Sequence, residues 1–359
     1  MFSFINRIQP DVDDLLLSLT PGSKPKRLHS IEIFLDQEIK DQVQLRCFGR
    51  DPSDLETREQ RLSAEIELHM ALGYDVFRLP VVRKGIFKLS NRSSDQKNSS
   101  RAWAEEKKGV IQNWEDFEKY SWPQVKDIDL RDFEWMEKNL PGNMGCYDLT
   151  AHIYEVISFL FGYESLCLFL YDEPDLVTAV CGKVGRFYAD YTEILAQMDK
   201  VPFLWGADDL GFRSGLLMPR DFIVNNILPW HKKCADAAHA AGKPYILHSC
   251  GNIREIMDDL IDDVGIDGKH SFEDAIQPVE EAFAVYGSRT AVLGGLDVDI
   301  LTRAPEQEIR RKTRDILDAC FRGSGYIFGT GNSVAAYVPL ENYCAMMDEA
   351  SRYSREITR

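Results

Sequence analysis

A histidine and a cysteine stand two residues apart in the segment YILHSCGN, residues 245–252, at the end of an apolar run. Side chains at positions i and i+2 of an extended segment point to the same side, so His248 and Cys250 can converge. Imidazole nitrogen and thiolate sulfur both suit Zn²⁺, which could activate a thiol or polarise a leaving-group oxygen. A hydrogen-bonded histidine beside a buried thiol is the alternative. We take His248 and Cys250 as candidate metal ligands that require a third protein ligand.

Polar and ionisable residues also follow the ends of the other apolar runs. We predict catalytic roles for Asp208, Glu273 and Asp297, and cofactor-binding roles for Tyr147, Asp209 and Asn332. Glu273, Asp297 or Asn332 could complete a zinc shell, and Glu273 or Asp297 could act as a general acid on a leaving group. Alternatively, Asp208 and Asp297 could each cap the helix that follows, and Asn332 could support a turn.

These side chains must be positioned by short β-rich runs that alternate with amphipathic helical segments. We expect strands at 29–35, 75–81, 143–149, 201–207, 243–249, 268–272, 290–296 and 325–331. Eight strands alternating with helices favour an α/β fold of the (β/α)8 TIM barrel type, whose active site forms at the carboxyl ends of the strands. A doubly wound open sheet is the competitor, but the segment GTGNS, residues 329–333, is not a GxGxxG fingerprint and follows the last strand.

The 359 residues are expected to form one domain, with an N-terminal extension and a long surface excursion around residues 84–125 that could serve as a lid or a subunit contact. A net charge of −16 argues against partners such as nucleic acid or an anionic membrane. The sequence shows neither a signal peptide nor an apolar run approaching the roughly 20 residues of a membrane span. Its eight scattered cysteines indicate reduced thiols and a cytoplasmic location.

Four segments resemble the uroporphyrinogen decarboxylase superfamily. They are WGADDLG (205–211), GKPYILHSCGNIREIMDDLIDDVGID (242–267), LGGLDVDIL (293–301) and GYIFGTGNSVAAYVPLENYCAMMDEA (325–350). The resemblance implies a (β/α)8 barrel and one of two chemistries. The decarboxylases of the superfamily use an N-terminal Arg-Gln-Ala-Gly-Arg segment and an aspartate after the second strand. This chain has no such segment and reads RLPVVRK (78–84) after its second strand. The acidic strand ends would also oppose a porphyrinogen that bears many carboxylates.

The other branch of the superfamily contains cobalamin-dependent methyltransferases that work with small corrinoid proteins. His248 and Cys250 match the zinc-binding His-x-Cys of the members that methylate a thiol, and Asn332 falls where these members have a second cysteine. Fewer soft ligands leave a more Lewis-acidic metal, which suits an ether or amine leaving group better than a thiol.

The resemblance therefore implies a corrinoid-dependent methyltransferase that demethylates a small methylated substrate, for example by O-demethylation of a methoxy-aromatic compound, and methylates the cobalamin of a partner corrinoid protein. A metal-free decarboxylase or lyase acting on another substrate is the main alternative, and a non-catalytic small-molecule binder is a third. By analogy with this group, a homodimer is expected.

Overall fold

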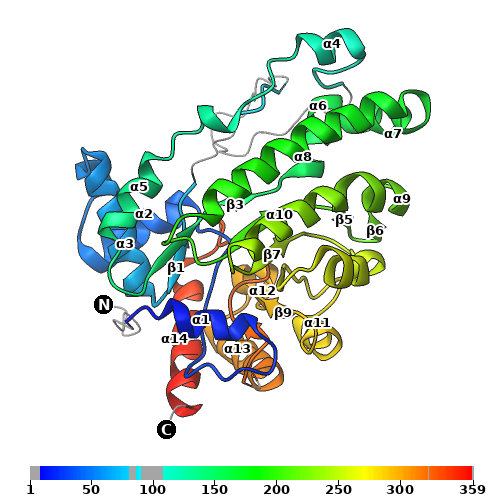
Figure 1. Ribbon diagram of the computed structural model, residues 1–359. Coiled ribbons are helices and arrows are strands. Elements are labelled where there is room, and N and C mark those ends of the chain that lie inside the picture. The colour runs from blue at the N-terminus through cyan, green and yellow to red at the C-terminus, as the bar shows by residue number, and fades with distance from the viewer. Residues whose placement is uncertain (1–8, 81–85, 90–107, 322, 358–359) are drawn as a thin grey trace.

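Parallel strands form the centre of the fold, and helices surround them (Figure 1). The computed structural model describes residues 9–80, 86–89, 108–321 and 323–357. The strands are β1 (Val76–Arg78), β2 (Gly145–Tyr147), β3 (Leu149–Thr150), β4 (Leu204–Ala207), β5 (Gly211–Phe212), β6 (Gly215–Leu216), β7 (Tyr245–His248), β8 (Gly268–His270), β9 (Ala291–Leu293) and β10 (Tyr326–Ile327). The helices are α1 (Val12–Leu19), α2 (Gln37–Phe48), α3 (Arg58–Leu72), α4 (Trp114–Lys119), α5 (Arg131–Asn139), α6 (Ile153–Phe161), α7 (Tyr163–Asp172), α8 (Pro174–Ala196), α9 (Arg220–Phe222), α10 (Leu228–Ala240), α11 (Val279–Tyr286), α12 (Val298–Arg303), α13 (Glu306–Cys320) and α14 (Leu340–Ile357).

The central strands follow one another in the order expected for a barrel. One sheet has the order β10-β9-β8-β7-β4-β3, all parallel, and β1 pairs in parallel with β2. The segment 30–35 lies beside the segment 326–334, which begins with β10, through two isolated parallel bridges, Ser30 with Phe328 and Leu35 with Val334. The predicted α/β fold is therefore confirmed as a mostly parallel, TIM-barrel-like arrangement.

One seam of this arrangement is not joined by strand pairing. Among the described residues, no ladder connects the segment 30–35 with β1. The Tyr147 hydroxyl instead donates a hydrogen bond to the backbone carbonyl of Glu32 near this seam. Because the two edges do not pair, space remains between them, and a cavity described below lies there.

Apolar side chains fill the interior between the strands. The alternating positions that share this cluster are Ile31, Ile33, Tyr147, Leu149, Phe203, Trp205, Ala207, Ala291 and Leu293. Val12, Leu15 and Leu19 of α1 belong to the same cluster, so the first helix covers one end of the barrel-like core. This helix forms the N-terminal extension expected from the sequence.

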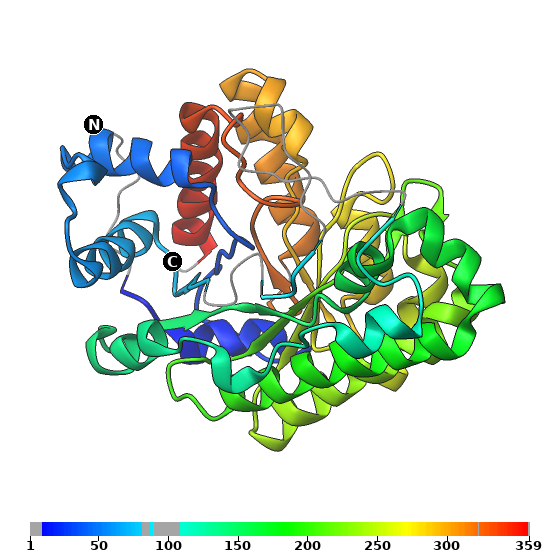
Figure 2. The ribbon, with the colours of Figure 1, turned by 90° about the horizontal axis from the view of Figure 1, so that it is seen from above.

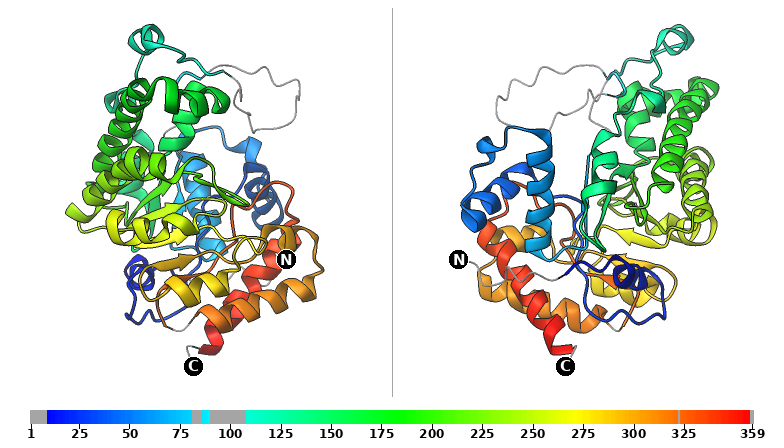
Figure 3. Two further views of the ribbon diagram at one scale, coloured as in Figure 1. Left: turned by 90° about the vertical axis from the view of Figure 1, so that its right-hand side faces the viewer. Right: turned by 60° about the vertical axis from the view of Figure 1, so that its left-hand side comes forward.

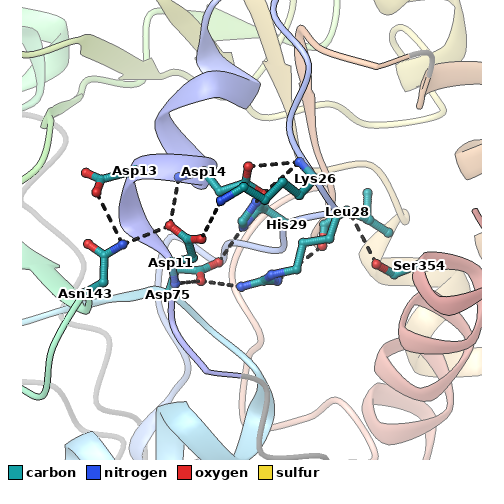
Figure 4. A network of polar contacts seen from close by, with 10 residues as sticks. Asp11, Asp13, Asp14, Lys26, Leu28, His29, Asp75, Asn143 and Ser354 are labelled. Carbon is teal, nitrogen blue, oxygen red and sulfur yellow. Dashed lines mark hydrogen bonds and ion pairs between the residues drawn. The ribbon is translucent and has the colours of Figure 1, made fainter. Parts of the chain in front are cut away.

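A buried polar network fixes α1 to the first barrel segment (Figure 4). The His29 ring lies between two carboxylates, with Nδ1 2.7 Å from Asp75 Oδ2 and Nε2 2.8 Å from Asp14 Oδ2. Arg27 also pairs with Asp75, and Asp11 caps α1 through the backbone N–H of Asp14. Every ring nitrogen of this buried histidine has a partner, so the network holds the helix without leaving an unsatisfied group.

The outer helices pack against one another around the strands. Helix α14 lies beside α13 and α2, so the end of the chain contacts its beginning (Figures 2 and 3). The expected excursion at 84–125 lies partly outside the described residues. Its described part includes α4, and the backbone of Gly109 and Ile111 donates hydrogen bonds to α6 carbonyls. Within the described ranges, no single helix is long and apolar enough to cross a membrane; only α6 and α7 together, across a 90° bend, reach that length and composition.

Candidate functional site

Three potential metal ligands converge at the carboxyl ends of β4 and β7. His248 Nε2 lies 3.4 Å from Cys250 Sγ and 3.5 Å from Asp209 Oδ1. One ligand atom from each of the three residues lies within 4.8 Å of the other two. His248 and Cys250 thus converge as the sequence predicts, and the structure adds Asp209, which the sequence analysis assigned to cofactor binding.

The spacing of these atoms suits a zinc ion. Zn–N or Zn–O bonds of about 2.0 Å and Zn–S bonds of about 2.3 Å, at tetrahedral angles, place neighbouring ligand atoms about 3.3–3.6 Å apart. The two contacts of His248 Nε2 fall within this range. Three protein ligands leave the fourth position of a tetrahedral ion open, as catalytic zinc sites require. The donor set Asp209, His248 and Cys250 therefore fits the implied metal.

A second histidine, His270, orients the imidazole of His248. The two residues are direct neighbours in the parallel pairing of β7 and β8, and their Nδ1 atoms lie 2.7 Å apart. His270 Nε2 lies 3.4 Å from the carbonyl oxygen of Thr330, which can only accept a hydrogen bond, so Nε2 carries the proton. Burial and the neighbouring His248 keep the pKa of His270 well below its usual value, so its Nδ1 is an acceptor. His248 Nδ1–H must therefore donate to it, and His248 Nε2 faces Asp209 and Cys250.

Charge at the cluster favours its ionised forms. Burial opposes ionisation of Asp209, but hydrogen bonds from His248 and from the backbone of Cys250 outweigh it and hold the pKa of this carboxyl well below its usual range. Burial also disfavours the His248 imidazolium, yet attraction to Cys250 and Asp209 raises the pKa of His248 to about 9. A metal that binds at neutral pH must therefore displace the Nε2 proton.

Asn332 stands beside the cysteine of the cluster. Its Nδ2 donates to Cys250 Sγ at 3.2 Å, and its Oδ1 accepts from the Ser333 backbone N–H, which defines the orientation of the amide. An amide donor to sulfur stabilises the thiolate form. Asn332 thus lies at the cluster, as a hydrogen-bond donor to Cys250.

Lys269 ties together the two loops that carry the cluster. Its buried ammonium donates to the carbonyls of Ser249 and Ser271, one from each loop. Burial lowers the pKa of Lys269 to about 8, although the charges of Cys250 and Asp209 oppose the shift. The lysine therefore fixes the loop of Cys250 against the loop that follows β8.

The loop of Cys250 also depends on two glycines that touch. A Cβ added to Gly251, whose φ is +77°, would lie 2.2 Å from the backbone of Gly211, and one added to Gly211 would lie 2.7 Å from the backbone N of Asn252. Because only backbone fits there, the loop after β7 lies directly on the loop after β4 that carries Asp209. This approach brings Cys250 N within 2.9 Å of Asp209 Oδ1.

Two residues predicted to be catalytic serve as caps in the structure. The fully buried Asp208 accepts hydrogen bonds from the backbone N–H groups of Tyr154 and Glu155 at the start of α6, and pairs with His231 at 3.0 Å. Asp297 caps α12 by accepting from the backbone N–H of Asp299. The contact of Asp297 corresponds to the capping alternative that the sequence left open, whereas Asp208 caps the preceding helix α6 and not the helix that follows it.

The remaining two predicted residues lie outside the cluster. Tyr147 is buried among core aromatic rings, and its ring centroid lies 4.9 Å from that of Trp205. Its hydroxyl donates a hydrogen bond to the backbone carbonyl of Glu32. Glu273 lines a small cavity of about 20 Å³ that also contacts Lys269, and it is absent from the described ligand cluster. The structure therefore does not bring either residue to the metal-binding atoms.

Sequence reasoning gave no role to His270, Lys269 or Glu32. His270 lies in the predicted strand 268–272, next to the strand of His248, so the pairing of adjacent strands was the available signal. Glu32 is a charged residue between two buried isoleucines, and a carboxyl in an apolar run is unusual enough to be singled out.

Comparisons with known proteins agree with the resemblance drawn from the sequence. The sequence model of the family described as "Uroporphyrinogen decarboxylase (URO-D)" matches residues 144–353, more than half of the chain. A protein named uroporphyrinogen decarboxylase from Paraburkholderia phytofirmans is 31% identical over 199 residues, which cover 52% of this chain and 50% of the relative. One of the same name from Roseiflexus sp. is 29% identical over 154 residues, covering 40% and 41%. The chain thus spans about half the length of these curated relatives or less.

Solved structures share the fold over nearly the whole chain. A methyltransferase from Methanosarcina mazei aligns with a TM-score of 0.72 at 16% identity, covering 96% of this chain and 99% of that one. A putative vitamin-B12 independent methionine synthase from Listeria monocytogenes aligns with a TM-score of 0.51 at 11% identity, covering 92% and 96%. At these identities the likeness establishes the fold alone.

Proposed function

Because the chain belongs to the uroporphyrinogen decarboxylase family, whose members include both decarboxylases and methyltransferases, we propose that it is a zinc-assisted methyltransferase. In this proposal it takes a methyl group from a small methylated substrate and passes it to the corrinoid of a partner protein. The cluster of Asp209, His248 and Cys250 is the observation that supports this function, since its donor set and spacing suit zinc with one position open. The full-length likeness to a methyltransferase is compatible with it.

In this proposal, the residues at the metal-ligand cluster have separate roles. Asp209, His248 and Cys250 would hold the ion, and zinc when bound would polarise the heteroatom that loses its methyl group. His270 fixes the His248 ring, so that Nε2 stays directed at the ion position. Asn332 donates to Cys250 Sγ and moderates its charge. The proposed reaction cleaves one carbon–heteroatom bond and forms one carbon–cobalt bond, with the electron pair supplied by the reduced cobalt of the partner's corrinoid, and the leaving heteroatom keeps its own pair and takes a proton from solvent.

Decarboxylation without metal is the second candidate. The curated relatives are named uroporphyrinogen decarboxylase. The structure also places two cations, Arg78 and Lys40, in the wall of one cavity. The sequence-based argument that acidic strand ends would repel a porphyrinogen did not take these cations into account. The absence of the Arg-Gln-Ala-Gly-Arg segment from the sequence weighs against action on a porphyrinogen.

Metal binding separates the two candidates. We would measure zinc bound per chain in the wild type, in the double variant His248→Ala/Cys250→Ala, and in the matched control His239→Ala/Cys167→Ala, whose residues lie elsewhere. The proposal predicts one zinc per chain in the wild type and the control, and loss in the double variant. Methylation of reduced free cobalamin by methoxy-aromatic compounds would then be assayed spectroscopically. A folded wild type that cannot bind added zinc would refute the proposal and favour the decarboxylase.

A further inference from the structure

A cavity of about 190 Å³ lies at the unpaired seam between the first barrel segment and β1. Its walls come from the segment 32–37, from α2 and α3, and from β1. Glu32, Phe34, Lys40, Phe77 and Arg78 are the lining residues that bear on its chemistry. Two aromatic rings and two cations in one cavity are a combination that suits a ligand with an apolar body and an anionic end.

The volume of the seam cavity suits an occupant of one ring. A cavity of about 150 Å³ in another protein binds benzene, so about 190 Å³ accommodates a single aromatic ring with one or two small substituents. A tetrapyrrole has four such rings and does not fit within this volume. The cavity therefore suits a much smaller ligand than a porphyrinogen.

Arg78 is available to bind an anion. Its Nε lies 3.4 Å from Asp148 Oδ1, and its guanidinium lies 5.3 Å from the ring centroid of Phe34. Among the described residues, none forms a hydrogen bond or an ion pair with either Nη group of Arg78. Asp148 also accepts hydrogen bonds from the backbone N–H of Leu149 and from the Tyr191 hydroxyl. Arg78 is thus held beside an aromatic ring with donors left for a carboxylate, which an arginine binds through two parallel hydrogen bonds.

The buried carboxyl of Glu32 does not repel an anion in the cavity, because the hydrogen bonds around it require Glu32 to be protonated and therefore neutral. The Thr330 hydroxyl approaches both Glu32 Oε2 and the backbone carbonyl of Asn332, yet it has one proton to donate. The carbonyl can only accept, so the contact with Glu32 is satisfied when Glu32 supplies the second proton. Burial raises the pKa of Glu32 to about 8, in agreement with this assignment.

The ionised groups that line the seam cavity at neutral pH are two cations and one anion, and both cations have carboxylate partners. Lys40 pairs with Glu65, Arg78 pairs with Asp148 through Nε, and Asp36 is the one anion among the described lining residues once Glu32 is protonated. Burial lowers the pKa of His69 to about 4, so this imidazole is neutral. The remaining ionisable lining group, Tyr74, keeps its proton because burial raises the pKa of its hydroxyl. Arg78 is therefore the lining cation that keeps hydrogen-bond donors for an anion.

The seam cavity also adjoins the metal-ligand cluster. Glu32 contacts Thr330, the Thr330 hydroxyl contacts the Asn332 carbonyl, and the Asn332 amide donates to Cys250 Sγ. Thr330 and Asn332 thus link Glu32 in the cavity wall to Cys250 of the cluster.

We propose that the seam cavity binds a single-ring aromatic carboxylate, with its carboxylate on Arg78 and its ring against Phe34 and Phe77. This binding site is separate from the metal-ligand cluster, so the inference does not depend on the proposed function. Binding itself requires no metal and no turnover.

Calorimetry with 4-methoxybenzoate as the probe tests the proposal on chelator-treated, metal-free full-length protein. We expect saturable binding of 4-methoxybenzoate that is about 10- to 100-fold tighter than binding of its neutral analogue 4-methoxybenzamide, because a hydrogen-bonded ion pair is lost with the amide. Arg78→Gln should weaken binding of the carboxylate by the same factor and leave the amide unaffected. Arg303→Gln, in an exposed ion pair far from the cavity, is the matched control.

A second variant guards against misfolding of Arg78→Gln. Gln37 lines the cavity and is exposed at the start of α2, so Gln37→Glu should fold and should weaken carboxylate binding by adding a negative charge. Absence of binding, equal affinity for acid and amide, or unchanged affinity in both variants would overturn the proposal. Binding that needs zinc and is lost in His248→Ala would place the carboxylate on the metal and would also overturn it. Failure of zinc binding alone would refute the proposed function and leave this site standing.

Discussion

Replacement of His270 by phenylalanine tests whether a second histidine sets the tautomer of a metal ligand. Phenylalanine keeps a ring at this position, and with it the edge contact with Trp205, but removes the acceptor that faces His248 Nδ1 at 2.7 Å. Once zinc occupies Nε2, the Nδ1–H of His248 is buried without a partner. An unsatisfied buried donor costs about 1–3 kcal/mol, which corresponds to a roughly 5- to 150-fold weaker affinity for zinc. Loss of an outer partner of a metal-bound histidine typically costs about 10- to 100-fold.

The assay is competition for zinc against a chelator of known affinity, with the folded state checked by circular dichroism and urea unfolding. His231→Phe is the matched control, because it also removes a buried, fully hydrogen-bonded imidazole, one that contacts Asp208 and Tyr245 rather than the metal cluster. This control should lose stability and keep its zinc affinity. A folded His270→Phe protein that binds zinc as tightly as the wild type would refute the tautomer argument.

Three further outcomes follow from the same contacts. Asn332→Cys should raise zinc affinity at least tenfold in the competition assay, because it places a soft thiolate donor beside Cys250 Sγ; an unchanged affinity would contradict the geometry of this pair. Asp208→Asn should cost about 3–5 kcal/mol of unfolding free energy, measured in urea, while zinc affinity stays the same, since it breaks a buried pair and a helix cap. For Glu32, the folded-state pKa is raised, so its protonated form stabilises the fold. That contribution is complete below about pH 4.5 and is lost as pH rises through about 8. Stability of the wild type relative to Glu32→Gln should therefore fall across this range by several kcal/mol, and parallel urea midpoints for the two proteins would contradict it.

The order of elements could be predicted from sequence because strand and helix patterns are local. Apolar runs with polar ends mark the strands, and each of the eight expected runs contains a described strand or bridge. The open seam could not be predicted, because it depends on whether the segment 30–35 and β1, joined by two helices, come close enough to pair. Sequence contains no local signal for that distance.

The site was predictable only in part, for a related reason. His248 and Cys250 share a face through their spacing, whereas Asp208 and Asp209 are adjacent acids at the end of one strand. Which of them faces the cluster is decided by how the chain turns after β4, and the structure shows Asp209 at the cluster and Asp208 under α6. The metal-ligand roles of these residues stay predictions. The role of His270 arises from pairing between strands, which no single segment encodes.

The pairing of the first barrel segment with the last has a consequence for how the protein is made. Glu32 and Thr330 are 298 positions apart, and their contact joins the first barrel segment to the last and holds the Glu32 carboxyl, which lines the seam cavity. At about 5–20 residues per second, a ribosome needs roughly 15–60 s to synthesise the partner of a strand that has already emerged. During that interval the apolar edge at 29–35 is exposed, so this chain is expected to depend on chaperones during synthesis. A truncated product that lacks its last thirty residues would leave the buried Glu32 carboxyl without Thr330, its hydrogen-bond partner.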